Sequence, residues 1–223
     1  NVDIFGNDYV GGISGYYEGT MTNIILSGKI SGNGKVGGIT GYGGIVNGAK
    51  VTATITGKSN YVGGISGGNN SVTNAYVKAT VTGNNYVGGI TGNGNVASSV
   101  MNGDISGYDF VGGITGKTIR AGNPYNTVKA VYKGGNVSGN SNVNLVLGAD
   151  NGSTILGYSI NGSTLNNENI TSASKNSLNG KVVDLNELTK SNYEELGFSF
   201  NESTDNPYWI YKSDGIVTLT NIN

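Results

Sequence analysis

Hydrophobic and polar positions recur along most of this chain with a fixed period. A hexapeptide, Val-Gly-Gly-Ile-Ser/Thr-Gly, occurs five times and begins at Val10, Val36, Val62, Val87 and Val111. The leading valines are 26, 26, 25 and 24 residues apart, and a degenerate sixth copy, Val143-Asn-Leu-Val-Leu-Gly148, follows 32 residues later. Self-similarity at a period of 20–50 residues is typical of stacked repeat architectures.

A second segment lies at a fixed offset from each hexapeptide and alternates with period two. In Val51-Thr-Ala-Thr-Ile-Thr-Gly57 the large and small apolar residues face one way and the threonines face the other. This alternation predicts a half-buried strand. A third short piece, such as Ile45-x-Asn47, comes before it. Each unit of about 25 residues is therefore predicted to contain three short strands joined by Gly/Asn turns.

One such unit cannot bury its apolar face alone, so neighbouring units must stack and pair strand on strand. The prediction is an all-β parallel β-solenoid (β-helix) of five to six coils over residues 1–162, whose handedness stays open. An antiparallel β-sandwich is the alternative, although it does not require so constant a register. Ten motif glycines are expected either to form corners with positive φ or to let coils approach closely: Gly11, Gly12, Gly37, Gly38, Gly63, Gly64, Gly88, Gly89, Gly112 and Gly113.

The C-terminal part of the chain has a different character. Residues 163–183 form a polar connector, and residues 184–223 are predicted to be a small α+β cap over the last coil. Solenoids need such a cap because their end strands are otherwise unpaired. Phe198, Phe200 and Trp209 are expected to cover the open core.

Local signals give the elements of this cap. The capping box Ser191-x-x-Glu194, with Gly197 as the C-terminal glycine, predicts a short helix over residues 192–196. A further turn is expected over residues 184–188. Asp214-Gly215 lies between two apolar segments and predicts a β-hairpin.

Composition narrows the chemistry that the chain can perform. Of its 223 residues 40 are glycine, none is histidine or cysteine, and the net charge is −1. The chain therefore has no HExxH zinc site, no Cys-His nucleophile and no disulfide. The near-zero net charge gives no electrostatic signature for nucleic-acid binding. No signal peptide and no membrane-spanning run is present, and no cofactor or metal is expected.

The residue before each motif valine forms a column in the predicted stack: Tyr9, Lys35, Tyr61, Tyr86 and Phe110. Tyr16, Tyr17 and Tyr42 could widen this column. One interpretation is an exposed aromatic strip that binds a glycan or a protein. The alternative, which the interruption at Lys35 favours, is a structural ladder of stacked rings.

Other candidate sites have weaker support. The outward threonines Thr52, Thr54, Thr56, Thr80 and Thr82 suggest an ice-binding array, but Lys29, Lys78 and Asp104 interrupt it. Asp8 and Asp109 align, yet Gly34, Asn60 and Asn85 break any ladder of calcium ligands, so both are interpreted as Asx-turn residues. Glu187, Glu194, Glu195 and Glu202 are interpreted as solvated. The long fifth interval contains Arg120 and Tyr125, which could contact a partner where an insertion leaves the solenoid.

The hexapeptide, followed by the pattern x-Asn-x-x-Val-x-Ala-x-Val-Thr-Gly, resembles the GLUG-motif repeat of bacterial surface proteins over roughly residues 1–162. Isoleucine stands here where the family's name-giving leucine would be. The tail segments Asn192-Tyr-Glu-Glu-Leu-Gly-Phe198, Trp209-Ile-Tyr and Gly215-Ile-Val-Thr-Leu219 resemble the segment that closes such repeats in IgA-specific zinc metallopeptidases. In those proteins the repeats belong to the non-catalytic region, and the catalytic HExxH helix has no counterpart in this chain.

The resemblance implies a non-catalytic, extracellular or cell-surface module that acts as a scaffold, a spacer or an adhesive surface. It also implies a parent protein that is an adhesin or a secreted zinc metallopeptidase acting on host glycoproteins such as IgA or mucins. The implied partners are other domains of the parent chain and a host protein or glycan. Two alternatives come from other classes: a carbohydrate-processing β-helix enzyme, which needs paired carboxylates on one face, and an ice-binding protein.

Overall fold

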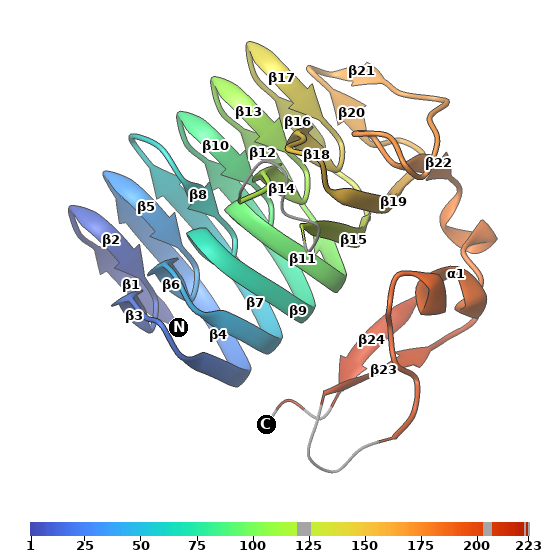
Figure 1. The fold of residues 1–223 in the computed structure, drawn as a ribbon, viewed down its shortest axis with the longest axis horizontal. Helices are drawn as coiled ribbons and strands as arrows, with labels where there is room; N and C mark the ends of the chain where they lie inside the picture. The colour runs from blue at the N-terminus through green and yellow to red at the C-terminus, as the bar shows by residue number, and fades with distance from the viewer. Residues whose placement is uncertain (120–125, 203–206, 221, 223) are drawn as a thin grey trace.

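A computed structural model of the chain describes residues 1–119, 126–202, 207–220 and 222. It confirms the predicted parallel β-solenoid, with about seven turns rather than five to six. The chain continues to stack on the regular repeats through residues 127–183, beyond the predicted end at residue 162 (Figure 1).

The hexapeptide valines form one wall of the solenoid. They lie in a six-stranded parallel sheet whose register pairs Val10 with Val36 and continues through Val62, Val87 and Val111 to the degenerate copy at Val143. Its strands are β2 (Asp8–Gly11), β5 (Gly34–Gly37), β8 (Val62–Gly63), β10 (Asn85–Gly88), β13 (Asp109–Gly112) and β17 (Ser141–Asn144). The constant sequence spacing thus corresponds to one in-register rung per repeat.

The other wall is a larger sheet in which long strands lie side by side. Its central strands are β4 (Thr20–Gly32), β7 (Ile45–Gly57), β9 (Ser66–Thr82) and β11 (Thr91–Asn102). Around them lie β1 (Val2–Phe5), β3 (Ser14–Tyr16), β6 (Thr40–Tyr42), β12 (Ile105–Ser106), β14 (Thr115–Lys117), β15 (Thr127–Tyr132), β16 (Asn136–Ser138), β18 (Leu147–Ala149), β19 (Thr154–Ile160), β20 (Thr164–Leu165), β21 (Glu168–Asn169) and β22 (Lys181–Val183).

The long strands differ from the expectation of three short strands per coil. The short third piece and the alternating segment are joined into one strand, which bends at a left-handed residue. These bends align from coil to coil at Asn23, Gly48, Asn74 and Ser98, with φ of 56°, 81°, 52° and 50°. A single left-handed residue changes the direction of the strand, and pairing with the neighbouring strand resumes at the next residue. Asn and Gly adopt this conformation at little cost.

The motif glycines are positions of close approach, and none of the ten has positive φ. A Cβ on the second glycine of each motif would lie 2.1–2.4 Å from a carbonyl oxygen of the next coil, as with Gly64 against the Gly89 oxygen. A Cβ on the first glycine would lie 2.0–2.2 Å from a carbonyl oxygen three residues later in the same coil, as with Gly88 against the Thr91 oxygen. Only glycine fits such backbone-to-backbone contacts.

The polar connector closes the end of the solenoid core. Leu165, Ile170 and Leu178 pack against the main cluster of buried side chains. The Leu178 carbonyl oxygen accepts hydrogen bonds from the Val146 and Leu147 amides at 3.0 and 2.9 Å. These contacts satisfy backbone donors that the last coil would otherwise leave unpaired.

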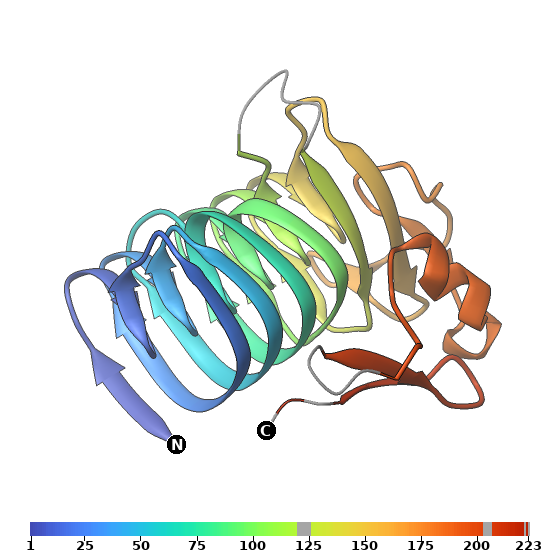
Figure 2. The same cartoon turned by 60° about the horizontal axis from the view of Figure 1, so that its bottom comes forward.

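The expected packing of Phe198, Phe200 and Trp209 over this end is wrong. These aromatic residues belong to a second apolar cluster, with Val100 and Val131, on the outer side of the large sheet. The hairpin of β23 (Tyr208–Tyr211) and β24 (Val217–Thr220) lies beside the coils, as Figure 2 shows. The outward side chains of Tyr76, Val100 and Val131 make the flank of the solenoid apolar. The tail therefore packs on this flank and not on the end of the core.

Local structure in the tail agrees with the sequence in part. The hairpin turn at Asp214-Gly215 is confirmed, with φ of 62° and 72°. A 3₁₀ turn over Leu185–Glu187 occupies the expected turn. The helix α1 spans Lys190–Glu195, and its N-cap is Thr189 rather than the predicted Ser191. Gly197, with φ of 89°, follows its C-terminus as predicted.

Candidate binding surfaces on the solenoid

The aromatic column lies at a corner where every residue adopts left-handed backbone geometry. Tyr9, Lys35, Tyr61, Tyr86 and Phe110 have φ between 53° and 65°, and Asn142 occupies the same position in the sixth copy. Positive φ is unusual for bulky residues and costs roughly 1–2 kcal/mol per residue. Something in the stack must offset this cost at each aromatic position.

Ring stacking provides that compensation in the middle of the column. The rings of Tyr61 and Tyr86 stack at 4.7 Å and 6°, and those of Tyr86 and Phe110 stack at 4.9 Å and 4°. The Lys117 ammonium lies 4.7 Å from the centre of the Phe110 ring. Burial raises the pKa of the Tyr61 hydroxyl. Because Tyr86 is covered on both faces, this part of the column is a structural ladder and offers ring edges rather than flat faces.

The first two coils carry an open aromatic cluster, which we call the tyrosine cluster: Tyr9, Tyr16, Tyr42 and Lys35. Tyr16 and Tyr42 stack at 6.2 Å and 15°, and the edge of Tyr9 meets both rings. The Lys35 ammonium lies 4.0 Å from the centre of the Tyr9 ring, so it completes the cluster rather than interrupting it. Tyr16 is 54 % exposed. A hydrogen bond to Glu18 raises the pKa of the Tyr16 hydroxyl.

A shallow groove of about 630 Å³ crosses the outer side of the long strands. Its floor is the column of small residues Gly28, Ala53, Ala79 and Gly103, which share register across the coils. Its lining also includes outward residues on either side of that column: Asp3, Lys29, Thr52, Thr54, Lys78, Thr80, Asn102 and Asp104. Ala53 and Ala79 also pack against the core, so their backbone forms the floor and the outward side chains on either side form the walls.

A smaller hollow of about 240 Å³ adjoins the groove, between the same sheet and the tail hairpin. Lys50, Tyr76 and Lys133 line it from the solenoid, and residues 216–219 line it from the tail. Lys50 and Tyr76 each lie two residues before a groove residue on the same outward face, Thr52 and Lys78. Burial lowers the pKa of the Lys133 ammonium.

The carboxylates of the solenoid are dispersed. Asp3 and Asp104 occupy opposite ends of the groove, four rungs apart, which corresponds to about 19 Å at the usual strand spacing. Within the described part of the chain, no group of three acidic residues is placed to hold a metal ion. In the same part, no helix is long and apolar enough to cross a membrane.

Asp8 and Asp109 bind protein donors. The Asp8 carboxylate accepts a hydrogen bond from the Gly34 amide at 3.0 Å. The Asp109 carboxylate accepts from the Phe110 amide, the Ser141 hydroxyl and the Asn142 side-chain amide. Partial desolvation opposes ionisation of Asp109, but these hydrogen bonds and the nearby Lys117 together lower its pKa. Both aspartates therefore serve to tie one coil to the next.

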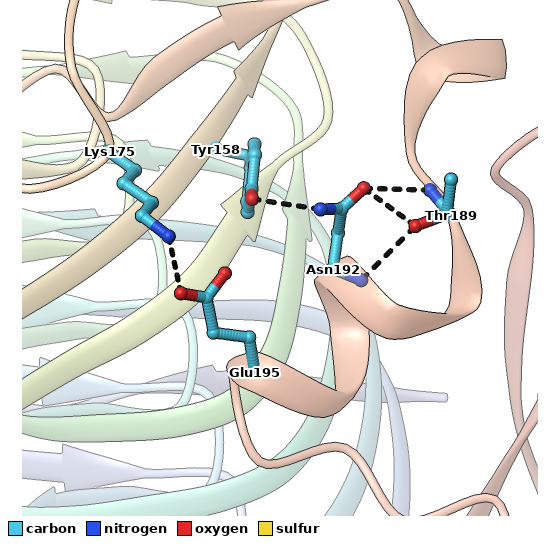
Figure 3. A network of polar contacts seen from close by, with 5 residues as sticks. All are labelled: Tyr158, Lys175, Thr189, Asn192 and Glu195. Atoms are coloured by element: carbon cyan, nitrogen blue, oxygen red, sulfur yellow. Dashed lines mark hydrogen bonds and ion pairs between the residues drawn. The ribbon is translucent and has the colours of Figure 1, made fainter.

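The tail is joined to the last coils by a polar network, drawn in Figure 3. The Asn192 amide nitrogen donates to the Tyr158 hydroxyl at 3.2 Å, while the Asn192 oxygen accepts from the Thr189 amide and hydroxyl. Lys175 forms an ion pair with Glu195. Tyr158 has a raised pKa because of burial and the neighbouring Glu195. This network fixes the helix against the last coils.

Two predicted contact residues, Arg120 and Tyr125, lie outside the residues that the structure describes. Sequence reasoning did not find the groove. The signal that could have found it is the small residue in the middle of each alternating segment. The structure shows that this small residue also forms the floor of an outer groove.

The fold and these surfaces define a parallel β-solenoid of short repeats with a laterally packed C-terminal segment. No protein-family model matches the chain, and no curated protein matches it. The fold is similar to that of a solved structure described as a putative immunoglobulin A1 protease from Bacteroides ovatus. The similarity has a TM-score of 0.60 at 18 % identity and covers 96 % of this chain and 72 % of the other. At this identity the likeness concerns the fold.

Proposed function

We propose that this chain is a non-catalytic extracellular solenoid module of a bacterial surface or secreted protein, which acts as a scaffold or spacer and presents a surface to a host ligand. The observation that carries the proposal is the unbroken register of one valine column through six coils, Val10 to Val143. A stack whose coils each contact both neighbours resists bending and holds whatever it is joined to at a set distance.

The parent protein in this proposal is a zinc metallopeptidase that acts on host glycoproteins such as IgA. Two observations support it: the repeated Gly-Gly-Ile-Ser/Thr-Gly motif and the likeness in fold to a structure described as a putative immunoglobulin A1 protease. Peptidase chemistry would then lie in another part of the parent, because this chain has no histidine for a zinc site.

The proposed contact surface for a host protein or glycan is the tyrosine cluster. Tyrosine offers a large amphipathic contact area and is enriched among the residues that dominate binding energy. Tyr16 is more than half exposed, and its ring contacts those of Tyr9 and Tyr42, over which the Lys35 ammonium lies.

Binding of the chain to immobilised human IgA and to mucin tests this surface. We expect Tyr16→Ala to weaken binding at least tenfold, which corresponds to about 1.4 kcal/mol. Tyr108→Ala is the matched control, because Tyr108 is 58 % exposed and lies away from the cluster. Absence of binding to every host glycoprotein, or equal loss in both variants, would contradict the adhesive part of the proposal.

The alternative of a carbohydrate-processing enzyme is less well supported by the groove geometry. Glycosidases hold their two carboxyl groups roughly 5–9.5 Å apart. Asp3 and Asp104 are about twice that distance apart when four rungs separate them. Release of reducing ends from a panel of polysaccharides by the purified chain would overturn the non-catalytic proposal.

A further inference from the structure

The groove has the shape of a site for an extended ligand. It crosses the coils from β1 to the residues after β11, so its long axis follows the rod rather than the strands. The floor is the backbone of Gly28, Ala53, Ala79 and Gly103, because the two alanine side chains pack against the core. A chain-like molecule laid in the groove would therefore meet a new coil about every 4.8 Å.

The groove lining is polar and rich in groups that bind sugars. Thr52, Thr54 and Thr80 are exposed, and each hydroxyl both donates and accepts hydrogen bonds. The Asn102 side chain adds an amide on the same side as Thr52. Hydroxyl-bearing rings find matching partners on such a surface, whereas the groove has no aromatic ring on which a nucleic-acid base could stack.

Four lysines give this side of the solenoid its charge. Lys29 and Lys78 line the groove, and Lys50 and Lys133 line the adjoining hollow. Among the residues that the structure describes, ion pairs join only Lys175 to Glu195 and Lys190 to Glu194, so these four lysines have no carboxylate within 4.0 Å.

The groove lysines Lys29 and Lys78 lie two coils apart on opposite sides of the floor column, about 10 Å along the rod. Lys133 is aligned with Asn102 and, one coil further, with Lys78, which places the two lysine positions about 10 Å apart. The acids Asp3 and Asp104 are confined to the ends of the groove, and the Asp104 carboxylate accepts a hydrogen bond from the Asn136 amide at 2.8 Å. Asp3 is in register with Lys29 of the next coil, so the positive charge in the middle of the groove is that of Lys78.

We infer that this groove binds a linear anionic polysaccharide, laid along the rod axis, whose carboxylate or sulfate groups contact Lys29 and Lys78 and whose hydroxyls bond to the threonines. The site goes beyond the proposed function, because it occupies a different stretch of each coil from the tyrosine cluster. It would stand even if binding to IgA and mucin failed.

Titration calorimetry of the full chain with size-matched oligosaccharides tests the inference. Hyaluronan provides carboxylates alone, heparin adds sulfates, and dextran is the neutral control. We expect hyaluronan, heparin or both to bind and dextran not to bind. Comparison of the first two identifies the acidic group that the site prefers.

Paired variants assign the binding to the groove. Lys29→Gln with Lys78→Gln should weaken binding at least tenfold, while Lys58→Gln with Lys181→Gln, a matched pair of exposed lysines outside the groove, should change it less than twofold. Thr54→Glu, which places a negative charge in the groove, should weaken binding without altering the circular dichroism spectrum. Tyr16→Ala should have no effect.

Three results would overturn the inference. The first is that neither acidic oligosaccharide binds. The second is equal loss in the groove pair and the control pair, which would indicate general attraction to lysines. The third is equally tight binding of a single-stranded oligonucleotide, which would show that charge alone is recognised.

Discussion

At the scale of single residues, the two glycines of each hexapeptide meet different packing demands. The first avoids a carbonyl oxygen of its own coil, and the second avoids one of the next coil, at distances that no Cβ tolerates. Neither needs positive φ. The left-handed corners are occupied instead by the aromatic column and by the aligned Asn23, Asn74 and Ser98. The motif glycines are thus required for space, and the corners are specified by other residues.

Gly64→Ala should therefore destabilise the solenoid by at least about 2 kcal/mol, because its Cβ would lie 2.1 Å from the Gly89 oxygen and the backbone must shift. The measurement is the urea midpoint of unfolding. Gly68→Ala in the same coil is the control: its Cβ would have no neighbour nearer than 3.5 Å. If both variants unfold at the same midpoint, close approach of the coils is not what the motif glycine provides.

At the scale of elements, the aromatic ladder shows how repetition stabilises an unfavourable backbone. One bulky residue with positive φ costs free energy, but a column of them at a fixed rung spacing can stack face to face. Tyr61, Tyr86 and Phe110 do so at 4.7 and 4.9 Å. In the sixth copy Asn142 takes the same corner without a ring, and asparagine tolerates this conformation.

Tyr86→Asn separates these two effects. Asparagine relieves the backbone cost but removes both stacks and the apolar area that the ring buries, so we expect a net loss of about 1–3 kcal/mol in the free energy of unfolding. Tyr86→Phe retains both stacks and should unfold like the parent chain. Chemical denaturation followed by fluorescence measures the difference. A stabilised Asn variant would show that the ladder contributes less than the strain at its corner.

At the scale of the whole molecule, the tail is a flank support whose docking depends on contacts remote in sequence. Trp209 is fully buried, packs on Phe198 at 4.6 Å and donates to the Asn74 oxygen at 3.3 Å. Asn74 lies at a bend of β9 (Ser66–Thr82), and the neighbouring bend at Gly48 leaves room for Pro207, whose Cγ lies 2.7 Å from where a Cβ would be.

Trp209→Ala should weaken tail docking by about 3–5 kcal/mol. Because the valine column and the main core do not include the tail, we expect the tail amides to lose protection from hydrogen exchange while the solenoid amides keep theirs. Ile210→Ala, at the neighbouring exposed position, is the control. Loss of protection throughout the chain would show instead that the tail and the solenoid fold as one unit.

Much of the architecture could be predicted from the sequence because it is set by local period. Apolar and polar residues that alternate with period two predicted the strands, and the 24–26-residue spacing predicted the valine register. Asp214-Gly215 predicted the hairpin turn. The helix cap could not be chosen in this way. Ser191-x-x-Glu194 and Thr189-x-x-Asn192 are both plausible starts, and Thr189 is the observed cap. Asn192 also bonds to Tyr158 on the last coils, which is a tertiary contact.

The sequence by itself determined the repeat, the parallel stack and the absence of histidine and cysteine chemistry, since these follow from composition and periodicity. Only the tertiary structure decided where the tail lies, which aromatic rings are covered and that a groove follows the small-residue column. Stacking brings equivalent residues of successive coils together, so period predicts their register. The outer surface and the tail bring together residues more than 100 positions apart, such as Asn74 and Trp209. Contacts of this kind depend on the shape of the folded chain, and no repeat in the sequence encodes them.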